Sequence, residues 1–108
     1  MASGSVVKFR PNIGYSDEGL IVSNSVQVLT PSKYVGSTGR SGGADSALIT
    51  NYGAAIRYTY SGTTPSSTVG HVLPDGGVLR LDGQNQMSQF KCIRVSSDSA
   101  IYVTYESE

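Results

Sequence analysis

From residue 46 onward, apolar and polar residues alternate over short stretches, and residues that favour turns separate these stretches. In 56–60, for example, Ile56, Tyr58 and Tyr60 alternate with Arg57 and Thr59. A period of two places successive side chains on opposite faces of a β-strand. Similar stretches at 47–51, 69–73, 78–81, 90–95 and 100–105 recur every 8 to 12 residues or so, a spacing typical of a β-sandwich or barrel.

We therefore expect an all-β, single-domain β-sandwich, jelly-roll or immunoglobulin-like, with about seven or eight strands and helix content near zero. The turn at 74–77, Pro-Asp-Gly-Gly, is the strongest turn signal, since proline presets φ and glycine accepts positive φ. Residues 82–86 are expected to form a loop. The residues predicted to be buried are Ile56, Leu79, Leu81, Ile93, Ile101 and Val103, and those predicted to lie largely outside are Arg57, Arg80 and Lys91.

The first third of the chain is less regular. We expect residues 1–19 to form an extended docking arm, with an apolar anchor at Val6, Val7 and Phe9, and residues 20–108 to form the sandwich domain. A near-alternation in 20–28 is interrupted at 23–25 by a turn or a bulge. Residues 36–46 are rich in glycine and serine and predict a long exposed loop.

Composition supports strands over helices and points away from charged partners. The 108 residues include 17 Ser, 8 Thr, 13 Gly and 4 Pro, which disfavour long helices. Eight basic and eight acidic residues give a net charge of zero, so electrostatic capture of nucleic acid or of an anionic membrane is not expected. Residues 1–10 show no apolar run typical of a signal peptide, and a single cysteine predicts folding in a reducing cytoplasm.

Candidate catalytic and metal-binding residues are few. His71 could serve as a general base in a Ser-His-Asp arrangement, but a structural position at a strand edge is the preferred interpretation. One histidine and one cysteine cannot supply a zinc site, and the adjacent acidic pair Asp17 and Glu18 predicts a surface turn. The glycine-rich loop lacks the lysine of a phosphate-binding loop. We expect Cys92 to be a buried, unreactive thiol, and no enzyme, cofactor or metal is predicted.

The seven tyrosines fall into two groups. Four lie within predicted strands, where β-propensity and packing explain them without a ligand: Tyr58, Tyr60, Tyr102 and Tyr105. The other three lie in predicted loops and are the better candidates for contact with a partner: Tyr15, Tyr34 and Tyr52.

The segment from 47 to 105 resembles small structural proteins of tailed bacteriophages. Residues 48–58 read LITNYGAAIRY and end a strand in an Asn-x-Gly turn; GTTP follows at 62–65. Residues 70–81 read GHVLPDGGVLRL, and the match closes with FKCIRV at 90–95 and IYVTY at 101–105. The resemblance implies a small β-sandwich that decorates or cements a phage capsid, commonly as a trimer.

On this resemblance the expected partners are further copies of the chain, as a homotrimer, and the major capsid protein of a phage head. The expected location is the capsid surface of the virion, and the host cytoplasm during assembly. Two alternatives stay open. One is a tail or fibre module that binds another virion protein or a host-surface glycan, the glycan through Tyr34 or Tyr52 beside polar loops. The other is a small hydrolase, which the residue inventory disfavours.

Overall fold

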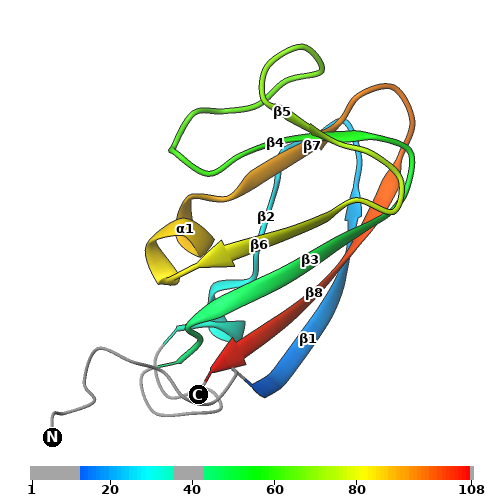
Figure 1. Cartoon of the computed structure of the whole chain (residues 1–108). Coiled ribbons are helices and arrows are strands. Elements are labelled where there is room, and N and C mark those ends of the chain that lie inside the picture. The colour runs from blue at the N-terminus through cyan, green and yellow to red at the C-terminus, as the bar shows by residue number, and fades with distance from the viewer. Residues whose placement is uncertain (1–12, 36–42, 108) are drawn as a thin grey trace, which may run out of the picture.

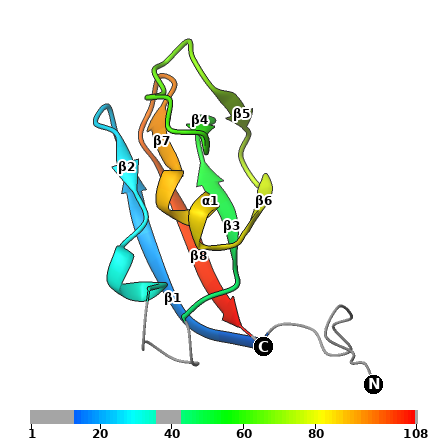
Figure 2. The ribbon, with the colours of Figure 1, turned by 90° about the vertical axis from the view of Figure 1, so that its left-hand side faces the viewer.

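The structure is a computed structural model that describes residues 13–35 and 43–107. Eight strands form two four-stranded antiparallel sheets that face each other (Figures 1 and 2). The strands are β1 (Ile13–Val22), β2 (Gln27–Val28), β3 (Ser46–Gly53), β4 (Ile56–Thr59), β5 (His71–Leu73), β6 (Val78–Asp82), β7 (Lys91–Arg94) and β8 (Ser99–Ser107). The expected all-β sandwich is confirmed.

The strand order identifies the sandwich as a jelly roll rather than an immunoglobulin-like fold. The first sheet has the order β1-β8-β3-β6 and the second sheet the order β2-β7-β4-β5. In the first sheet β1 pairs with β8 and β3 with β6, and in the second sheet β2 pairs with β7 and β4 with β5. The chain is thus one long antiparallel hairpin with its tip between β4 and β5, rolled into two layers, which is the eight-stranded jelly-roll arrangement.

The N-terminal arm predicted for residues 1–19 is wrong in its second part. Residues 13–19 belong to β1, which pairs with β8 from Ile13 opposite Ser107 to Val22 opposite Ser99. Val22 is fully buried and Leu20 packs against the core, so β1 is an integral edge strand. Residues 1–12, with the anchor at Val6, Val7 and Phe9, lie outside the described residues.

Most of the side chains predicted to be buried lie in the core. Ile56, Leu81, Ile101 and Val103 are buried, and Leu79 is partly buried against them. Cys92 is buried, as expected. Of the three basic residues predicted to lie largely outside, Arg80 is exposed, whereas Arg57 and Lys91 are half-buried.

Ile93 is a correction, because it lies on the outer side of β7 and is half-buried. The inward side chains of this segment are those of Phe90 and Cys92, both fully buried. Cys92 and Ile93 are both apolar, so alternation alone does not decide which of them faces inward. The ring of Phe90, two residues before Cys92, fills the core and sets the register.

A second correction concerns residues 82–86, predicted to be a loop within a helix-free chain. The connection from β6 to β7 contains a short helix, α1 (Gln84–Gln89), and a 3-10 turn, η1 (Pro31–Lys33), follows β2. Helix α1 begins after Gly83 at a positive φ of 87° and buries Met87. This short helix lets the chain cross between the sheets while it contributes the apolar side chain of Met87 to the core.

Three turns meet at the fully buried side chain of Asn51, near the end of β3. Its Nδ2 lies 3.0 Å from the carbonyl oxygens of Ala54 and Leu73 and 3.2 Å from that of Pro74. Its Oδ1 accepts a hydrogen bond of 2.6 Å from the hydroxyl of Ser99. One amide therefore connects the β3–β4, β5–β6 and β7–β8 turns.

The backbone of Asn51 adds to the same junction. Its N–H donates to the carbonyl of Gly77, and its carbonyl accepts from the N–H of Gly76. Gly76 has a φ of 79°, in the left-handed region, and the turn closes with Gly77 N–H donating to Pro74 at 2.8 Å. The Asn-x-Gly and Pro-Asp-Gly-Gly motifs, separate in the sequence, thus form one interlocked structure.

We expect Leu81→Ala to lower the free energy of unfolding by about 2 to 5 kcal/mol, because it removes a fully buried side chain. Val78→Ala on the exposed side of the same strand should change it by less than about 0.5 kcal/mol. Urea denaturation of both variants measures the difference, and equal stabilities would contradict the assignment of faces in β6.

Replacement of Asn51 by alanine should cost about 3 kcal/mol, because it leaves buried carbonyl groups and the Ser99 hydroxyl without their partner. The matched control is Asn24→Ala, at an exposed bend between β1 and β2, which should be nearly neutral. Thermal and urea denaturation test the pair. A neutral effect of Asn51→Ala would show that the turns hold without the amide.

Burial raises the pKa of the Cys92 thiol from 9.0 to about 12. The folded state holds this proton more tightly than the unfolded state does. The stabilisation of the folded state by the protonated thiol is therefore complete below pH 9 and is lost as the pH rises toward about 12. The free energy of unfolding should therefore fall over this range, by at most about 1.4 kcal/mol per pH unit from this group. Urea titrations across the range should show a shallower fall for Cys92→Ala, and identical slopes would contradict the prediction.

Candidate functional site

The outer side of the first sheet carries a row of apolar side chains at one end. Its most exposed members are Ile21, Tyr52, Val78 and Tyr102, with exposed fractions of 65, 59, 60 and 44%. We call this surface the apolar face; its members are Ile21, Thr50, Tyr52, Val78, Ala100 and Tyr102.

Strand register brings these residues together from all four strands of the sheet. Ala100 lies opposite both Ile21 on β1 and Tyr52 on β3. Thr50 lies opposite both Tyr102 on β8 and Val78 on β6. The apolar face is therefore continuous across the sheet.

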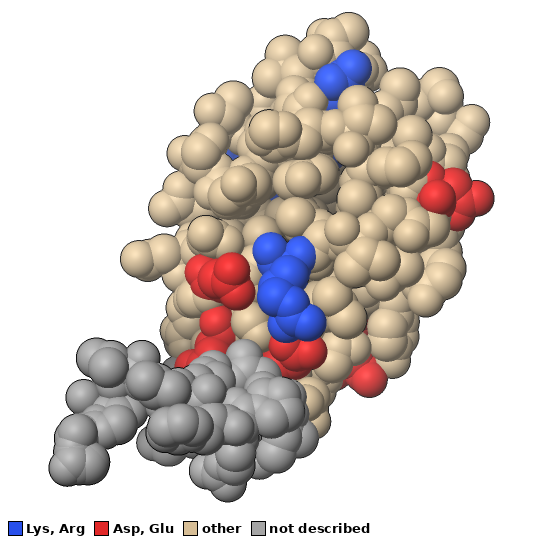
Figure 3. All heavy atoms as spheres, in the orientation of Figure 1, with Lys and Arg blue, Asp and Glu red and all other residues tan. Residues whose placement is uncertain are grey.

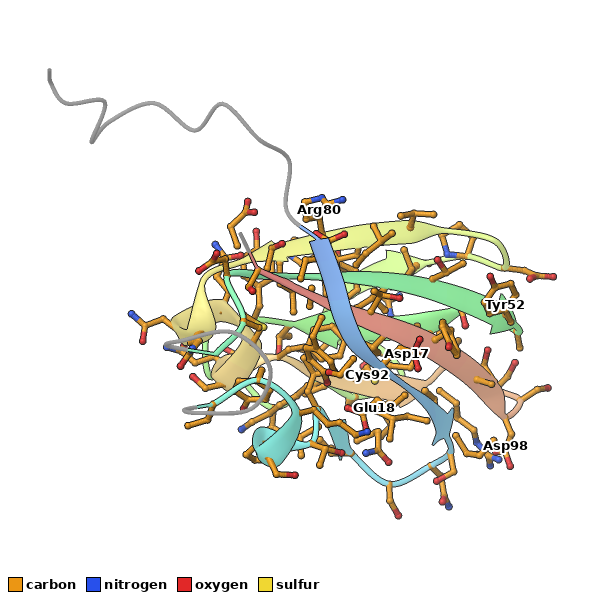
Figure 4. The ribbon with its side chains drawn as sticks, turned by 90° about the horizontal axis from the view of Figure 1, so that it is seen from below. Asp17, Glu18, Tyr52, Arg80, Cys92 and Asp98 are labelled. Atoms are coloured by element: carbon orange, nitrogen blue, oxygen red, sulfur yellow. The ribbon has the colours of Figure 1, made fainter. Side chains whose placement is uncertain are left out.

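Charged groups of this sheet gather toward its other end. Arg80 forms an ion pair with Glu106, and the Ser46 hydroxyl donates to the same carboxylate at 2.8 Å. In Figure 3, basic and acidic residues lie side by side in the lower part of this view, and most of the remaining surface is uncharged. Figure 4 shows Arg80 and Tyr52 well separated along the molecule. At that end of the sheet, Arg80 and Glu106 are thus paired with each other.

Asp17 borders the apolar face, on β1. The carboxylate of Asp17 close to the Tyr102 hydroxyl raises the pKa of that phenol. The Tyr102 side chain itself stays exposed.

The Asp17–Glu18 pair is not the surface turn predicted from the sequence, since both residues lie within β1. Glu18 points inward and binds the start of η1: Thr30 donates to it from its hydroxyl at 2.6 Å and from its backbone N–H at 3.2 Å. The Tyr105 hydroxyl also donates to this carboxylate. Burial and this hydrogen bond raise the pKa of Tyr105. Glu18 is a structural residue (Figure 4).

The three tyrosines predicted to contact a partner have different positions. Tyr52 is exposed on the apolar face, at the end of β3 rather than in a loop. Tyr34 is a correction: it is 4% exposed and its ring stacks on Tyr105 at 5.9 Å, so it belongs to the core. Tyr15 lies in β1, and its side chain is outside the described residues, as are Val6, Val7 and Phe9.

A pocket of about 500 Å³ lies where β4 leads into the loop toward β5. It is lined by Thr59, Tyr60, Ser61, Thr63, Val69, Gly70 and His71. The rings of Tyr60 and His71 lie 6.2 Å apart, and each lies against Tyr58, at 6.3 and 5.3 Å. Tyr58 in turn stacks on the buried ring of Phe90 at 6.0 Å. The pocket wall is therefore anchored in the core.

Sequence reasoning missed Tyr102 and Tyr60 as surface residues, because both lie in or beside predicted strands. For Tyr102 the signal was present: Ile101 and Val103 point inward, so the residue between them must point outward. For Tyr60 alternation predicted an inward side chain. The strand ends at Thr59, however, and the Tyr60 ring emerges at the open end of the sandwich, 41% exposed.

Within residues 13–35 and 43–107 no group of three or more His, Cys, Asp or Glu residues could hold a metal ion. No helix in this part of the chain is long and apolar enough to cross a membrane. Comparison with protein-family models, with curated proteins and with solved structures finds no match.

Proposed function

We propose that the protein is a non-enzymatic structural protein of a bacteriophage virion. In this proposal it is a capsid decoration protein that binds the major capsid protein of the head, stabilises the shell and acts as a homotrimer. The observation that carries the proposal is the apolar face, which exposes two tyrosines and two large aliphatic side chains on one side of one sheet.

A continuous apolar surface of this kind favours a protein partner. Side chains such as Ile21 and Val78 gain free energy when another surface removes them from water, at about 25 cal/mol per Å². Monomeric proteins rarely expose contiguous apolar patches larger than about a few hundred Å², and tyrosine is enriched in protein interfaces. The partner in the proposal is the outer surface of the shell.

The outer side of the second sheet is a weaker candidate. It also exposes valines, Val28 on β2 and Val72 on β5. Lys91 lies opposite Val28, and Arg57 lies opposite Val72, so a cation neighbours each valine. Burial of this side against a partner would desolvate those cations, which costs free energy unless the partner supplies counter-charges.

Two further observations support a virion role. The eight-stranded jelly roll is an architecture found in viral capsid domains, although a shared architecture alone does not fix a function. The motifs that resemble phage structural proteins are also those that interlock at Asn51, so the resemblance involves residues that hold this fold together.

The trimer rests on the resemblance and on a physical advantage of multivalent binding. Three linked subunits that engage three equivalent shell sites gain about 10² to 10⁴ in avidity without a new kind of contact. A net charge of zero allows identical subunits to meet without strong repulsion.

The proposal predicts that Val78→Glu weakens binding to phage heads by about 100-fold or more, because it would bury an unpaired carboxylate in the contact. Val72→Glu is the matched control, since this valine is 51% exposed on a strand of the other sheet. Binding is measured by co-sedimentation with heads that lack the protein, and the oligomeric state by light scattering.

Wild-type protein that is monomeric and does not bind heads would contradict the proposal. An equal loss of head binding in Val78→Glu and Val72→Glu would contradict the proposal that the apolar face contacts the shell. If Val78→Glu dissociated the trimer, the apolar face would be the contact between subunits instead of the contact with the shell.

A further inference from the structure

We infer that the pocket beside Tyr60 and His71 is a binding site for a neutral saccharide, which takes one pyranose ring. This site lies on a different sheet from the apolar face, and the inference goes beyond the proposed function. It also differs from a glycan site at Tyr34 or Tyr52, because Tyr34 is buried and Tyr52 lies on the outer side of the other sheet.

The size and charge of the pocket define the class of ligand. Its volume of about 500 Å³ lies within the range of about 300 to 1,000 Å³ that is usual for small-molecule sites. None of its seven lining residues is Asp, Glu, Lys or Arg. The lining offers no carboxylate, ammonium or guanidinium group as a counter-charge, so an uncharged ligand suits it better.

The lining combines apolar surfaces with hydroxyl groups, as a sugar does. A pyranose ring presents C–H groups on its faces and hydroxyls around its rim. The half-exposed rings of Tyr60 and His71 and the side chain of Val69 offer surfaces for the C–H groups. Ser61 and Thr63, which carry hydroxyls, also line the pocket. Both kinds of contact are therefore available to one ring.

Polar atoms at the pocket are free to bind a ligand. The Tyr60 hydroxyl and the imidazole nitrogens of His71 form no hydrogen bond within the part of the chain that the structure describes. Thr59 differs, because its hydroxyl donates to the carbonyl of Thr63 and so fixes the loop.

The loop that forms the pocket is held in place from its strand. Arg57 donates from Nη1 to the carbonyl of Gly70 at 2.7 Å and from Nε to that of Ser67 at 3.1 Å. Gly70 has a φ of 124°, and a Cβ there would lie 2.9 Å from the carbonyl oxygen of Tyr58. A glycine is thus required for this close approach. A pocket already ordered before binding loses little conformational entropy on binding.

The rings of Tyr60 and His71 are also held in place, because they pack against Tyr58, which packs against the core. Tyr58 separates the pocket rings from Phe90, which is fully buried. The aromatic surface offered to a ligand is therefore fixed by packing and does not depend on the ligand for its position.

The test uses the full-length protein labelled with ¹⁵N and titrated with methyl pyranosides of glucose, galactose, mannose, rhamnose and N-acetylglucosamine. We expect at least one sugar to shift the amide signals of residues 60–63 and 69–71. Tyr60→Ala should weaken that binding about tenfold, because a stacking ring is lost. Tyr60→Phe keeps the ring and should retain most of the affinity.

Tyr52→Ala is the matched control, an exposed tyrosine on the other sheet that should leave sugar binding unchanged. An otherwise unchanged amide spectrum confirms that each variant is folded. Absence of shifts with every sugar would overturn the inference, as would shifts at the apolar face instead. Shifts at the pocket with a neutral peptide but with no sugar would make it a peptide site and overturn the saccharide assignment.

Discussion

The side-chain amide of Asn51 is the interaction on which the arrangement of this sandwich depends. A rolled hairpin needs its successive turns to stay in register, although the residues that form them are far apart in the sequence. The amide contacts the carbonyl of Leu73, 22 residues away, and the hydroxyl of Ser99, 48 residues away. Because the site is buried, each bond lacks competition from water, and loss of the amide would leave several polar groups unsatisfied.

The same residue also determines which side chains the first sheet exposes. Alternation along β3 directs Asn51 inward, so Thr50 and Tyr52 must point outward. Register then aligns Tyr102, Val78 and Ile21 with them. The apolar face is therefore a consequence of the buried junction beneath it. Away from this junction, the inward carboxylate of Glu18 accepts hydrogen bonds from the hydroxyls of Thr30 and Tyr105.

Strands and tight turns could be predicted from the sequence because they are set by local alternation and by glycine and proline. The wrong predictions concern residues whose position is set by a contact with a residue far away in the sequence. Residues 13–19 were predicted to be an arm, but they pair with β8. Tyr34 was predicted to contact a partner, but its ring stacks on Tyr105. Ile93 was misplaced because both neighbours in Cys92-Ile93 are apolar. The pocket was not predictable, since it depends on the Arg57 bonds that shape a loop ten or more residues away.

The two candidate surfaces are separated by the architecture itself. From the turn near Asn51, β4 carries the chain about 10 Å along the second sheet before the pocket begins. The apolar face lies on the outer side of the first sheet, which is turned away from the second. A partner that covers Tyr52 and Val78 would therefore leave Tyr60 and His71 open to solvent. Binding through the outer side of the first sheet therefore does not use the residues that line the pocket at the end of β4.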